Sequence, residues 1–160
     1  MRNKQTIIEI FTEGNENVDN YLNIKLKAIS INEKVARNIV ASFLLELNPS
    51  IEELSDVKTA VSEAVTNSIV HGYKGKAGEI TLTAKLKENN LYIKIEDFGI
   101  GIDDIGQAMQ PFFTTGPEGE RSGMGFTVME TFMDELRVYN QPNSKGVVVE
   151  MAKEIKSSEK

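Results

Sequence analysis

Cysteine is absent from this 160-residue sequence, which excludes disulfide bonds, thiolate metal sites and cysteine nucleophiles. A chain without cysteine suits a reducing cytoplasm, which is where we expect the protein to act. No apolar run in the sequence approaches the roughly 20 residues that a membrane-spanning helix needs. The first residues also lack the apolar segment of a signal peptide, so we expect no association with a membrane.

An excess of basic residues is also missing, because 18 Lys and Arg stand against 24 Asp and Glu and give a net charge of -6. Direct binding of nucleic acid needs a concentrated basic face, so the composition argues against it. A hydrophobic content of 40% and a charged content of 26% are typical of globular proteins. The length fits one domain with a proper core.

The spacing of apolar residues predicts strands interleaved with helices. Expected strands occupy a short segment at 7–11 and then 22–28, 80–86, 91–95, 136–139 and 147–151. Two expected helices follow capping boxes, Ser30 with Glu33 and Ser50 with Glu53, and two more occupy 105–109 and 125–135.

Because most of these strands follow one another as hairpins, the pattern predicts an α+β sandwich. One mixed, mostly antiparallel sheet is expected to carry its helices on one face. We expect residues 1–20 to form an N-terminal lead-in of unknown role, residues 21–152 to form the domain, and residues 153–160 to form a charged tail.

Glu63 and Asn67 are the first candidate functional residues, because a spacing of four places both on one stripe of a helix. That stripe lies roughly opposite Val61 and Val65, which are expected to face the core. The pair offers a carboxylate beside an oxygen ligand of the kind that magnesium takes. For the pair alone, the simpler interpretation is that both side chains face solvent.

Asp97 ends an apolar strand and precedes Gly99 and Gly101. A carboxylate in this position can accept a hydrogen bond from an exocyclic amine such as that of adenine, and the glycines let the backbone approach a ligand closely. A capped turn is the alternative. The triplet Asp97-Phe98-Gly99 also matches a metal-binding motif of eukaryotic-type protein kinases, but the other motifs of that fold are absent from the sequence.

The segment Gly123-Met124-Gly125 stands just before an expected helix, where free backbone N–H groups bind phosphate. Arg121 adds a cation that can meet phosphate oxygens. The preceding segment 111–122 is predicted to be a long loop, and long loops are often functional lids. Arg37 lies off the apolar stripe of its helix and is either solvated or an interface anchor. His71 is expected near a helix end, where a cation favours the helix dipole.

The order of these motifs resembles the GHKL superfamily of ATPases and kinases, which includes gyrase, Hsp90 and histidine kinases. Residues 63–73 and 113–126 are the most specific part, and they look like the family of anti-sigma F factors of spore-forming bacteria. The resemblance runs from about residue 22 to about residue 151. It implies the Bergerat ATP-binding α/β sandwich and the activity of a protein serine kinase.

The resemblance also implies a role for each motif residue. Glu63 would be the general base for the substrate serine, and Arg121 would stabilise the transferring phosphoryl group. Asn67 would ligate Mg²⁺, and Asp97 would bind the adenine amine. The remaining residues implied at the ATP site are Gly99, Gly101, Thr115, Gly123, Met124 and Gly125. Arg37 matches an arginine that contacts the sigma factor.

The family further implies partners: a sigma factor of the sigma F type, held when ATP is bound, and an anti-anti-sigma factor that is phosphorylated on serine and displaces it. The resemblance implies a homodimer that uses ATP and Mg²⁺ in the regulation of sporulation. Two alternatives stay open. One is a switch kinase acting on a general stress sigma factor, and the other is a binding protein without catalysis, in which ATP only sets the conformation.

Overall fold

The computed structural model describes residues 6–111 and 125–156 and has a five-stranded sheet with the order β1-β2-β3-β5-β4. The strands are β1 (Asn20–Lys27), β2 (Glu79–Lys87), β3 (Asn90–Glu96), β4 (Glu135–Asn140) and β5 (Val147–Glu154). The four pairings are antiparallel, so within the described residues the sheet is antiparallel throughout, whereas the sequence pattern predicts a mixed sheet. No described strand pairs in parallel, because the chain returns from β3 to β5 and from β4 to β5 in the opposite direction.

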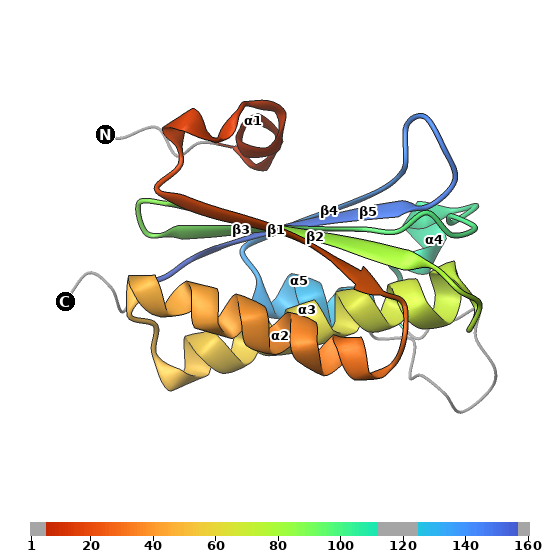
Figure 1. The fold of residues 1–160 in the computed structure, drawn as a ribbon, viewed down its shortest axis with the longest axis horizontal. Coiled ribbons are helices and arrows are strands. Elements are labelled where there is room, and N and C mark those ends of the chain that lie inside the picture. Colours follow the sequence, from red (N-terminus) through yellow and green to blue (C-terminus); the bar gives the residue numbers. More distant parts are fainter. Residues whose placement is uncertain (1–5, 112–124, 157–160) are drawn as a thin grey trace.

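The helices are α1 (Ile7–Thr12), α2 (Ile31–Leu44), α3 (Ile51–Asn67), α4 (Ile105–Ala108) and α5 (Gly125–Phe132). Three-residue 3₁₀ turns cover Asn15–Asn17 and Leu45–Leu47, and a π-helical turn, Ser68–Gly72, continues α3. Figure 1 shows that α2, α3 and α5 cover one face of the sheet, whereas α1 lies on the other face. The predicted α+β sandwich is confirmed, with α1 as an addition on the second face.

The main core lies between the sheet and the three larger helices. Val57, Val61 and Val65 of α3 are fully buried against alternate residues of the central strands, such as Leu82 and Ile93. This burial confirms the apolar stripe expected for α3 and leaves the stripe of polar residues to face away from the sheet. No helix within residues 6–111 and 125–156 is long and apolar enough to cross a bilayer.

The lead-in before β1 contains a helix where the sequence analysis expects a strand at 7–11. The helix begins at a capping box, in which Glu9 N donates to Thr6 Oγ1 at 3.2 Å and Thr6 N donates to Glu9 Oε2 at 2.9 Å. Ile7 and Ile10 expose only 2% and 1% of their surface. The strand prediction is wrong because apolar residues three apart fall on one face of a helix.

α1 covers a small second core on its face of the sheet, formed by its two isoleucines with Tyr92 and Ala152. Lys85 Nζ donates to the carbonyl of Ile10 at 2.9 Å and lies 5.6 Å from the centroid of the Phe11 ring. Burial lowers the pKa of the Lys85 ammonium, and the nearby Lys94 cation adds to this effect.

The helix after Ser30 forms as expected, but its capping box does not. Ser30 has helical backbone angles, φ -54° and ψ -38°, and no described backbone N–H bonds to its side chain. The Glu33 carboxylate instead accepts a hydrogen bond from Arg37 Nη1 at 3.0 Å. An N-cap residue normally has extended backbone, which turns its side chain toward the first turn, so this prediction is wrong.

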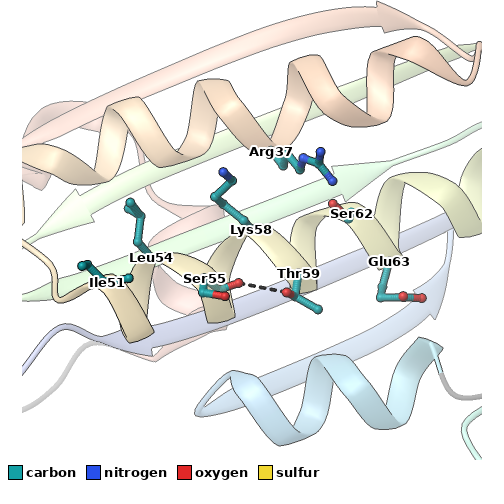
Figure 2. Close-up of a pocket in the computed structure, with 8 residues that line it drawn as sticks. All are labelled: Arg37, Ile51, Leu54, Ser55, Lys58, Thr59, Ser62 and Glu63. Carbon is teal, nitrogen blue, oxygen red and sulfur yellow. Dashed lines mark hydrogen bonds between the residues drawn. The ribbon is translucent and has the colours of Figure 1, made fainter.

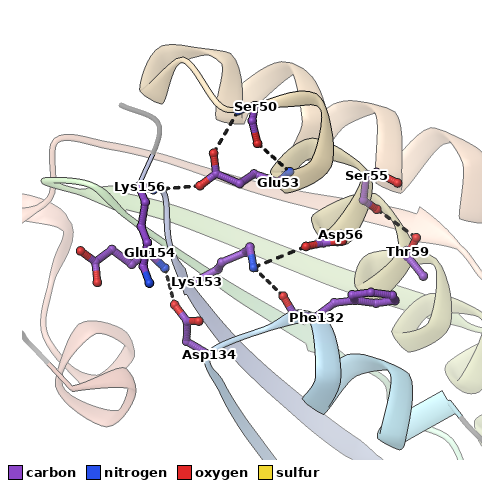
Figure 3. A network of polar contacts seen from close by, with 10 residues as sticks. All are labelled: Ser50, Glu53, Ser55, Asp56, Thr59, Phe132, Asp134, Lys153, Glu154 and Lys156. Carbon is purple, nitrogen blue, oxygen red and sulfur yellow. Dashed lines mark hydrogen bonds and ion pairs between the residues drawn. The ribbon is translucent and has the colours of Figure 1, made fainter. Parts of the chain in front are cut away.

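The capping box at the start of α3 is confirmed. Glu53 N donates to Ser50 Oγ and Ser50 N donates to Glu53 Oε1, both at 3.0 Å. The other carboxylate oxygen of Glu53 accepts from Lys156 N at 2.8 Å. Figure 3 shows how this one side chain joins the start of α3 to the segment after β5.

A second connection lies one turn along α3 (Figure 3). Lys153 Nζ, on β5, lies 3.7 Å from Asp56 Oδ2 of α3 and donates to the carbonyl of Phe132, the last residue of α5, at 2.7 Å. The N-terminal end of α3, the end of α5 and β5 are therefore held together by polar contacts as well as by the core.

Candidate functional site

The C-terminal half of α3 and the first residue of α5 meet at the predicted catalytic pair. Gly125 lies so close that a Cβ atom there would be 3.2 Å from Glu63 Oε2 and 3.1 Å from Asn67 Nδ2. Contacts of that length are tighter than side chains normally make, so glycine allows α5 to begin beside both groups. The structure therefore brings together Glu63, Asn67 and Gly125, which lie about 60 residues apart in the sequence.

Asp97 follows β3 directly and is almost fully buried, with 2% of its surface exposed. Its Oδ1 atom accepts hydrogen bonds from the backbone N–H groups of Gly99 and Val147, each at 3.1 Å. Burial raises the pKa of the Asp97 carboxyl, while hydrogen bonds from Gly99, Ser68 and Val147 oppose the rise. A buried carboxylate fixed by backbone donors is suited to bind a specific polar group.

Glycines allow two other segments, which contain Gly72 and Gly146, to approach the Asp97 turn. A Cβ atom on Gly72, at the end of the π-helical turn, would lie 3.0 Å from Asp97 Oδ2. A Cβ on Gly99 would lie 2.1 Å from the carbonyl oxygen of Gly72. Gly146 has φ +123°, and a Cβ there would lie 2.0 Å from the Asp97 carbonyl oxygen. Side chains at these positions would push the segments apart, so the close packing around Asp97 depends on these glycines.

Gly101 has φ +79°, which confirms that this position needs the left-handed backbone that glycine adopts readily. Gly99, by contrast, is needed for close approach rather than for its backbone angles. Between these glycines and Asp97, the side chains of Phe98 and Ile100 are 53% and 56% exposed. The turn therefore presents an apolar rim beside a buried carboxylate.

A groove between α2 and α3 leads to Glu63 (Figure 2), and its volume is about 450 Å³. Arg37, the predicted partner-binding residue, lies on the α2 side. Within the described part of the chain, Arg37 Nε and Ser62 Oγ are buried without a hydrogen-bond partner. The lining residues are Arg37, Ile51, Leu54, Ser55, Lys58, Thr59, Ser62 and Glu63. The groove thus joins the predicted partner-binding arginine to the predicted base.

Four of the residues singled out in the sequence, Thr115, Arg121, Gly123 and Met124, lie outside the described residues. His71 lies in the last turn of the helix, as expected. Sequence reasoning missed Ser68 and Gly72 at the Asp97 pocket. The signal available was position, since both follow Asn67 on the same helical segment.

The donor set at Glu63 and Asn67 fits a magnesium ion better than a softer metal. Both side chains offer oxygen atoms, and the Asn67 Oδ1 and Glu63 Oε2 atoms lie at the same 3.2 Å from the Cβ position of Gly125. Magnesium prefers oxygen ligands and commonly takes only one or two from the protein, with the rest from phosphates and water. No group of three or more His, Cys, Asp or Glu that could hold a metal occurs among the residues described.

The chain is similar to known proteins over most of its length. A protein-family model described as the histidine kinase-like ATPase domain matches residues 29–153. The anti-sigma F factor of Thermoanaerobacter sp. (strain X514) is 54% identical over 138 residues, which cover 86% of this chain and 96% of that protein. The anti-sigma F factor of Clostridium kluyveri is 54% identical over 135 residues, 84% of this chain and 94% of that protein.

Solved structures share the fold at low sequence identity. The RsbU and RsbW domains of a Mycobacterium tuberculosis protein align with a TM-score of 0.61 and 19% identity, over 85% of this chain and 32% of that longer chain. The catalytic domain of the histidine kinase ThkA aligns with a TM-score of 0.55 and 15% identity, over 85% of this chain and 96% of that domain.

Proposed function

The chain belongs to the histidine kinase-like ATPase family and, within it, to the anti-sigma F factors, and on this premise we propose that it is a serine protein kinase that couples ATP to a sigma factor. The observation that carries the proposal is the meeting of Glu63, Asn67 and Gly125 at one point beside the groove. A carboxylate, an amide oxygen and the start of a helix are the groups that phosphoryl transfer from a magnesium nucleotide needs.

In the proposed reaction, Glu63 accepts the proton of the substrate serine hydroxyl as that oxygen attacks the γ-phosphorus of ATP, the bond from the γ-phosphorus to the β–γ bridging oxygen breaks, and ADP leaves. Its place at the end of the groove supports this role, because a protein substrate lying there presents a side chain to the carboxylate. Arg121 is proposed to balance the charge on the transferring phosphoryl group.

ATP is proposed to lie between the Asp97 turn and the start of α5. Asp97 accepts a hydrogen bond from the adenine amine, and Gly99 and Gly101 keep the turn close to the base. Backbone N–H groups at Gly123, Met124 and Gly125, with the Thr115 hydroxyl, bind the phosphates. Asn67 holds Mg²⁺, which neutralises phosphate charge when it is bound.

The proposed partners are a sigma factor of the sigma F type and an anti-anti-sigma factor that carries the acceptor serine. Arg37 is proposed to contact the sigma factor, and its buried Nε atom without a described partner supports a role at an interface. The working form is proposed to be a homodimer. The names of the relatives support the sigma factor as a partner.

The test is to incubate the protein with γ-labelled ATP, Mg²⁺ and an anti-anti-sigma protein, and to identify the phosphorylated residue. We expect label on serine and a loss of label when magnesium is chelated. Absence of labelling in the presence of intact, ATP-dependent sigma binding would overturn the kinase proposal and favour a nucleotide-gated binding protein.

The sigma interface is tested with Arg37→Ala, for which we expect a loss of sigma affinity of about tenfold or more, as for an interface anchor. The matched control is Lys34→Ala, which removes an exposed cation from the same helix. Equal sigma affinity in Arg37→Ala and the parent protein would remove Arg37 from the interface.

A further inference from the structure

The turn at residues 97–102 carries the proposed base-binding carboxylate, yet it lies outside any strand or helix. Its first residue is held by β5, since Asp97 N donates to the Val147 carbonyl at 3.0 Å, and side chains from other segments hold further backbone groups. Phe98 N donates to the Tyr73 hydroxyl at 2.8 Å, and Ile102 N donates to Asn140 Oδ1 at 2.8 Å. A side chain therefore holds each end of the turn, in addition to the bonds that Asp97 itself makes to Val147.

Tyr73 holds the first end, from the segment that follows the π-helical turn. Besides accepting from Phe98 N, its hydroxyl donates to the carbonyl of Glu79 at 2.5 Å. Its ring fills the space beside Gly78, where a Cβ would lie 2.4 Å from a ring carbon. One hydroxyl group thus links the end of the α3 segment, the start of β2 and the turn.

Asn140 holds the second end, from the last position of β4. Its side chain bonds both to the N–H and to the carbonyl of Ile102, since Nδ2 donates to Ile102 O at 2.8 Å. The side-chain amide thus makes the same two hydrogen bonds to Ile102 that a residue on a neighbouring β-strand would make. The amide also lies against Gly101, where a Cβ would be 3.0 Å from Asn140 Oδ1. Asn140 therefore fixes the place where the turn needs its left-handed glycine.

A third link holds the Asp97 backbone itself. Gln141 Nε2 donates to the Asp97 carbonyl at 3.3 Å, and Ile100 N donates to the carbonyl of Gly72 at 3.0 Å. The turn is thus held from the α3 segment on one side and from β4 on the other. A polar group that selects one base must keep its geometry, because a misplaced acceptor loses its hydrogen bond to the ligand.

We propose that Tyr73 and Asn140 are positioning residues that hold the 97–102 turn and thereby set the affinity and base preference of the nucleotide site. Neither needs to touch the nucleotide, since both act through Asp97. The inference rests on the proposed assignment of Asp97 to the adenine amine. It adds to that site two residues, Tyr73 and Asn140, to which the sequence motifs assign no role.

The test uses Tyr73→Phe, which keeps the ring beside Gly78 and removes only the hydroxyl, and Asn140→Leu, which removes both bonds to Ile102. Binding of ATP and of inosine triphosphate is measured, because inosine lacks the amine that Asp97 would accept from. For each variant we expect ATP to bind about tenfold more weakly, as for a lost hydrogen bond to the site. The preference for ATP over inosine triphosphate should shrink by a similar factor.

Three controls separate the outcomes. Tyr139→Phe removes another partly buried tyrosine hydroxyl, which bonds to Glu150 away from the turn, and should leave the ATP preference unchanged. Asn140→Asp keeps the acceptor for Ile102 N and should restore part of the preference. In the kinase assay, KM for ATP should rise in Tyr73→Phe and Asn140→Leu while kcat stays constant.

If Tyr73→Phe and Asn140→Leu lose thermal stability but keep the parent preference for ATP, the two residues are structural only and the inference is wrong. If Asp97→Asn itself leaves the affinity for ATP unchanged, the assignment of Asp97 fails, and the inference falls with it. If Asp97→Asn binds ATP more weakly while Tyr73→Phe and Asn140→Leu bind ATP as the parent protein does, the inference is wrong and the proposed function stays intact.

Discussion

At its N-terminal end α3 is tied to β5 and α5 by paired polar groups, whereas its C-terminal end carries Glu63 and Asn67 beside the first residue of α5 and continues into the π-helical turn that packs against the buried carboxylate of Asp97. At the first end the Glu53 carboxylate accepts hydrogen bonds from two backbone N–H groups, those of Ser50 and Lys156, and Lys153 pairs with Asp56. At the second end, burial raises the pKa of Asp97, and Ser62 Oγ is buried without a partner within the described residues.

The difference shows that one end of the helix contributes mainly to the stability of the fold, whereas the other end carries the proposed functional groups. Paired groups at the first end gain little from any ligand, because their hydrogen bonds are already made. At the second end, Asp97 Oδ1 already accepts from two backbone N–H groups, but a carboxylate has further lone pairs for a donor on a ligand, and Ser62 Oγ has no hydrogen-bond partner among the described residues. Substitutions at the two ends should therefore separate activity from stability.

The largest expected effect is on the rate of phosphoryl transfer, which should differ between Glu63→Gln and Glu53→Gln. Glu63→Gln keeps the shape of the side chain but removes the proton acceptor, so phosphoryl transfer to the anti-anti-sigma protein should fall by about 10²–10⁴-fold. ATP affinity should be retained. The rate of serine labelling is the measurement, and Glu53→Gln should keep the parent rate. Full-rate transfer by Glu63→Gln would show that the carboxylate is not the base.

The second effect is on nucleotide binding. Asp97→Asn removes the charge that accepts the adenine amine, so the Kd for ATP should rise by about 10–100-fold. Titration calorimetry with ATP measures it. The control is Asp56→Asn, which changes a carboxylate at the other end of α3 and should leave the Kd unchanged. An equal loss of ATP affinity in Asp97→Asn and Asp56→Asn would mean that the two ends of α3 do not differ in their role in nucleotide binding.

The third effect is on folding. Glu53→Ala removes the reciprocal cap and the acceptor for Lys156 N, so the free energy of unfolding should drop by about 1–2 kcal/mol while ATP affinity stays the same. Denaturant unfolding followed by circular dichroism measures it. Glu52→Ala, an exposed carboxylate of the same first turn, should lose only a few tenths of that amount. A loss of ATP affinity in Glu53→Ala would contradict the division between the ends.

The smallest expected effect is on the pH dependence of stability. Because the pKa of Asp97 is raised above its ordinary value of 3.8, the folded state holds this proton more tightly than the unfolded state. The contribution of Asp97 to stability therefore declines as the pH rises from about 3.8 through the raised pKa. Asp97→Asn should gain stability relative to the parent over this window and keep the gain at neutral pH. If the free energy of unfolding of Asp97→Asn and of the parent protein changed with pH in parallel, this prediction would be wrong.

The capping boxes illustrate how far local sequence predicts local structure. Ser50 and Ser30 are each followed three residues later by glutamate, yet only Ser50 forms the cap. At Ser30 the backbone is already helical and Glu33 pairs with Arg37, so a contact inside the helix overrides the local signal. The capping box of Thr6 and Glu9 was also visible in the sequence and would have predicted a helix rather than a strand.

The candidate site also contains features that the local sequence predicts and features that it does not. The spacing of Glu63 and Asn67 predicts one stripe of α3, and the place of Asp97 after a strand predicts a turn; both are confirmed. The approach of Gly72 to Asp97 and the bond from Asn140 to Ile102 could not be predicted, because they join segments 25 and 38 residues apart. Such contacts depend on how the sheet brings β3 and β4 to either side of β5.

The contact between α1 and β5 has a consequence for synthesis of the chain. The cluster that buries Ile7 and Ile10 includes Ala152, so α1 is synthesised well before the strand that completes its packing. A contact between residues this far apart in the sequence closes a long loop, which costs more chain entropy than a local contact does. Until that contact forms, the isoleucines of α1 remain exposed to whatever other surface the growing chain offers.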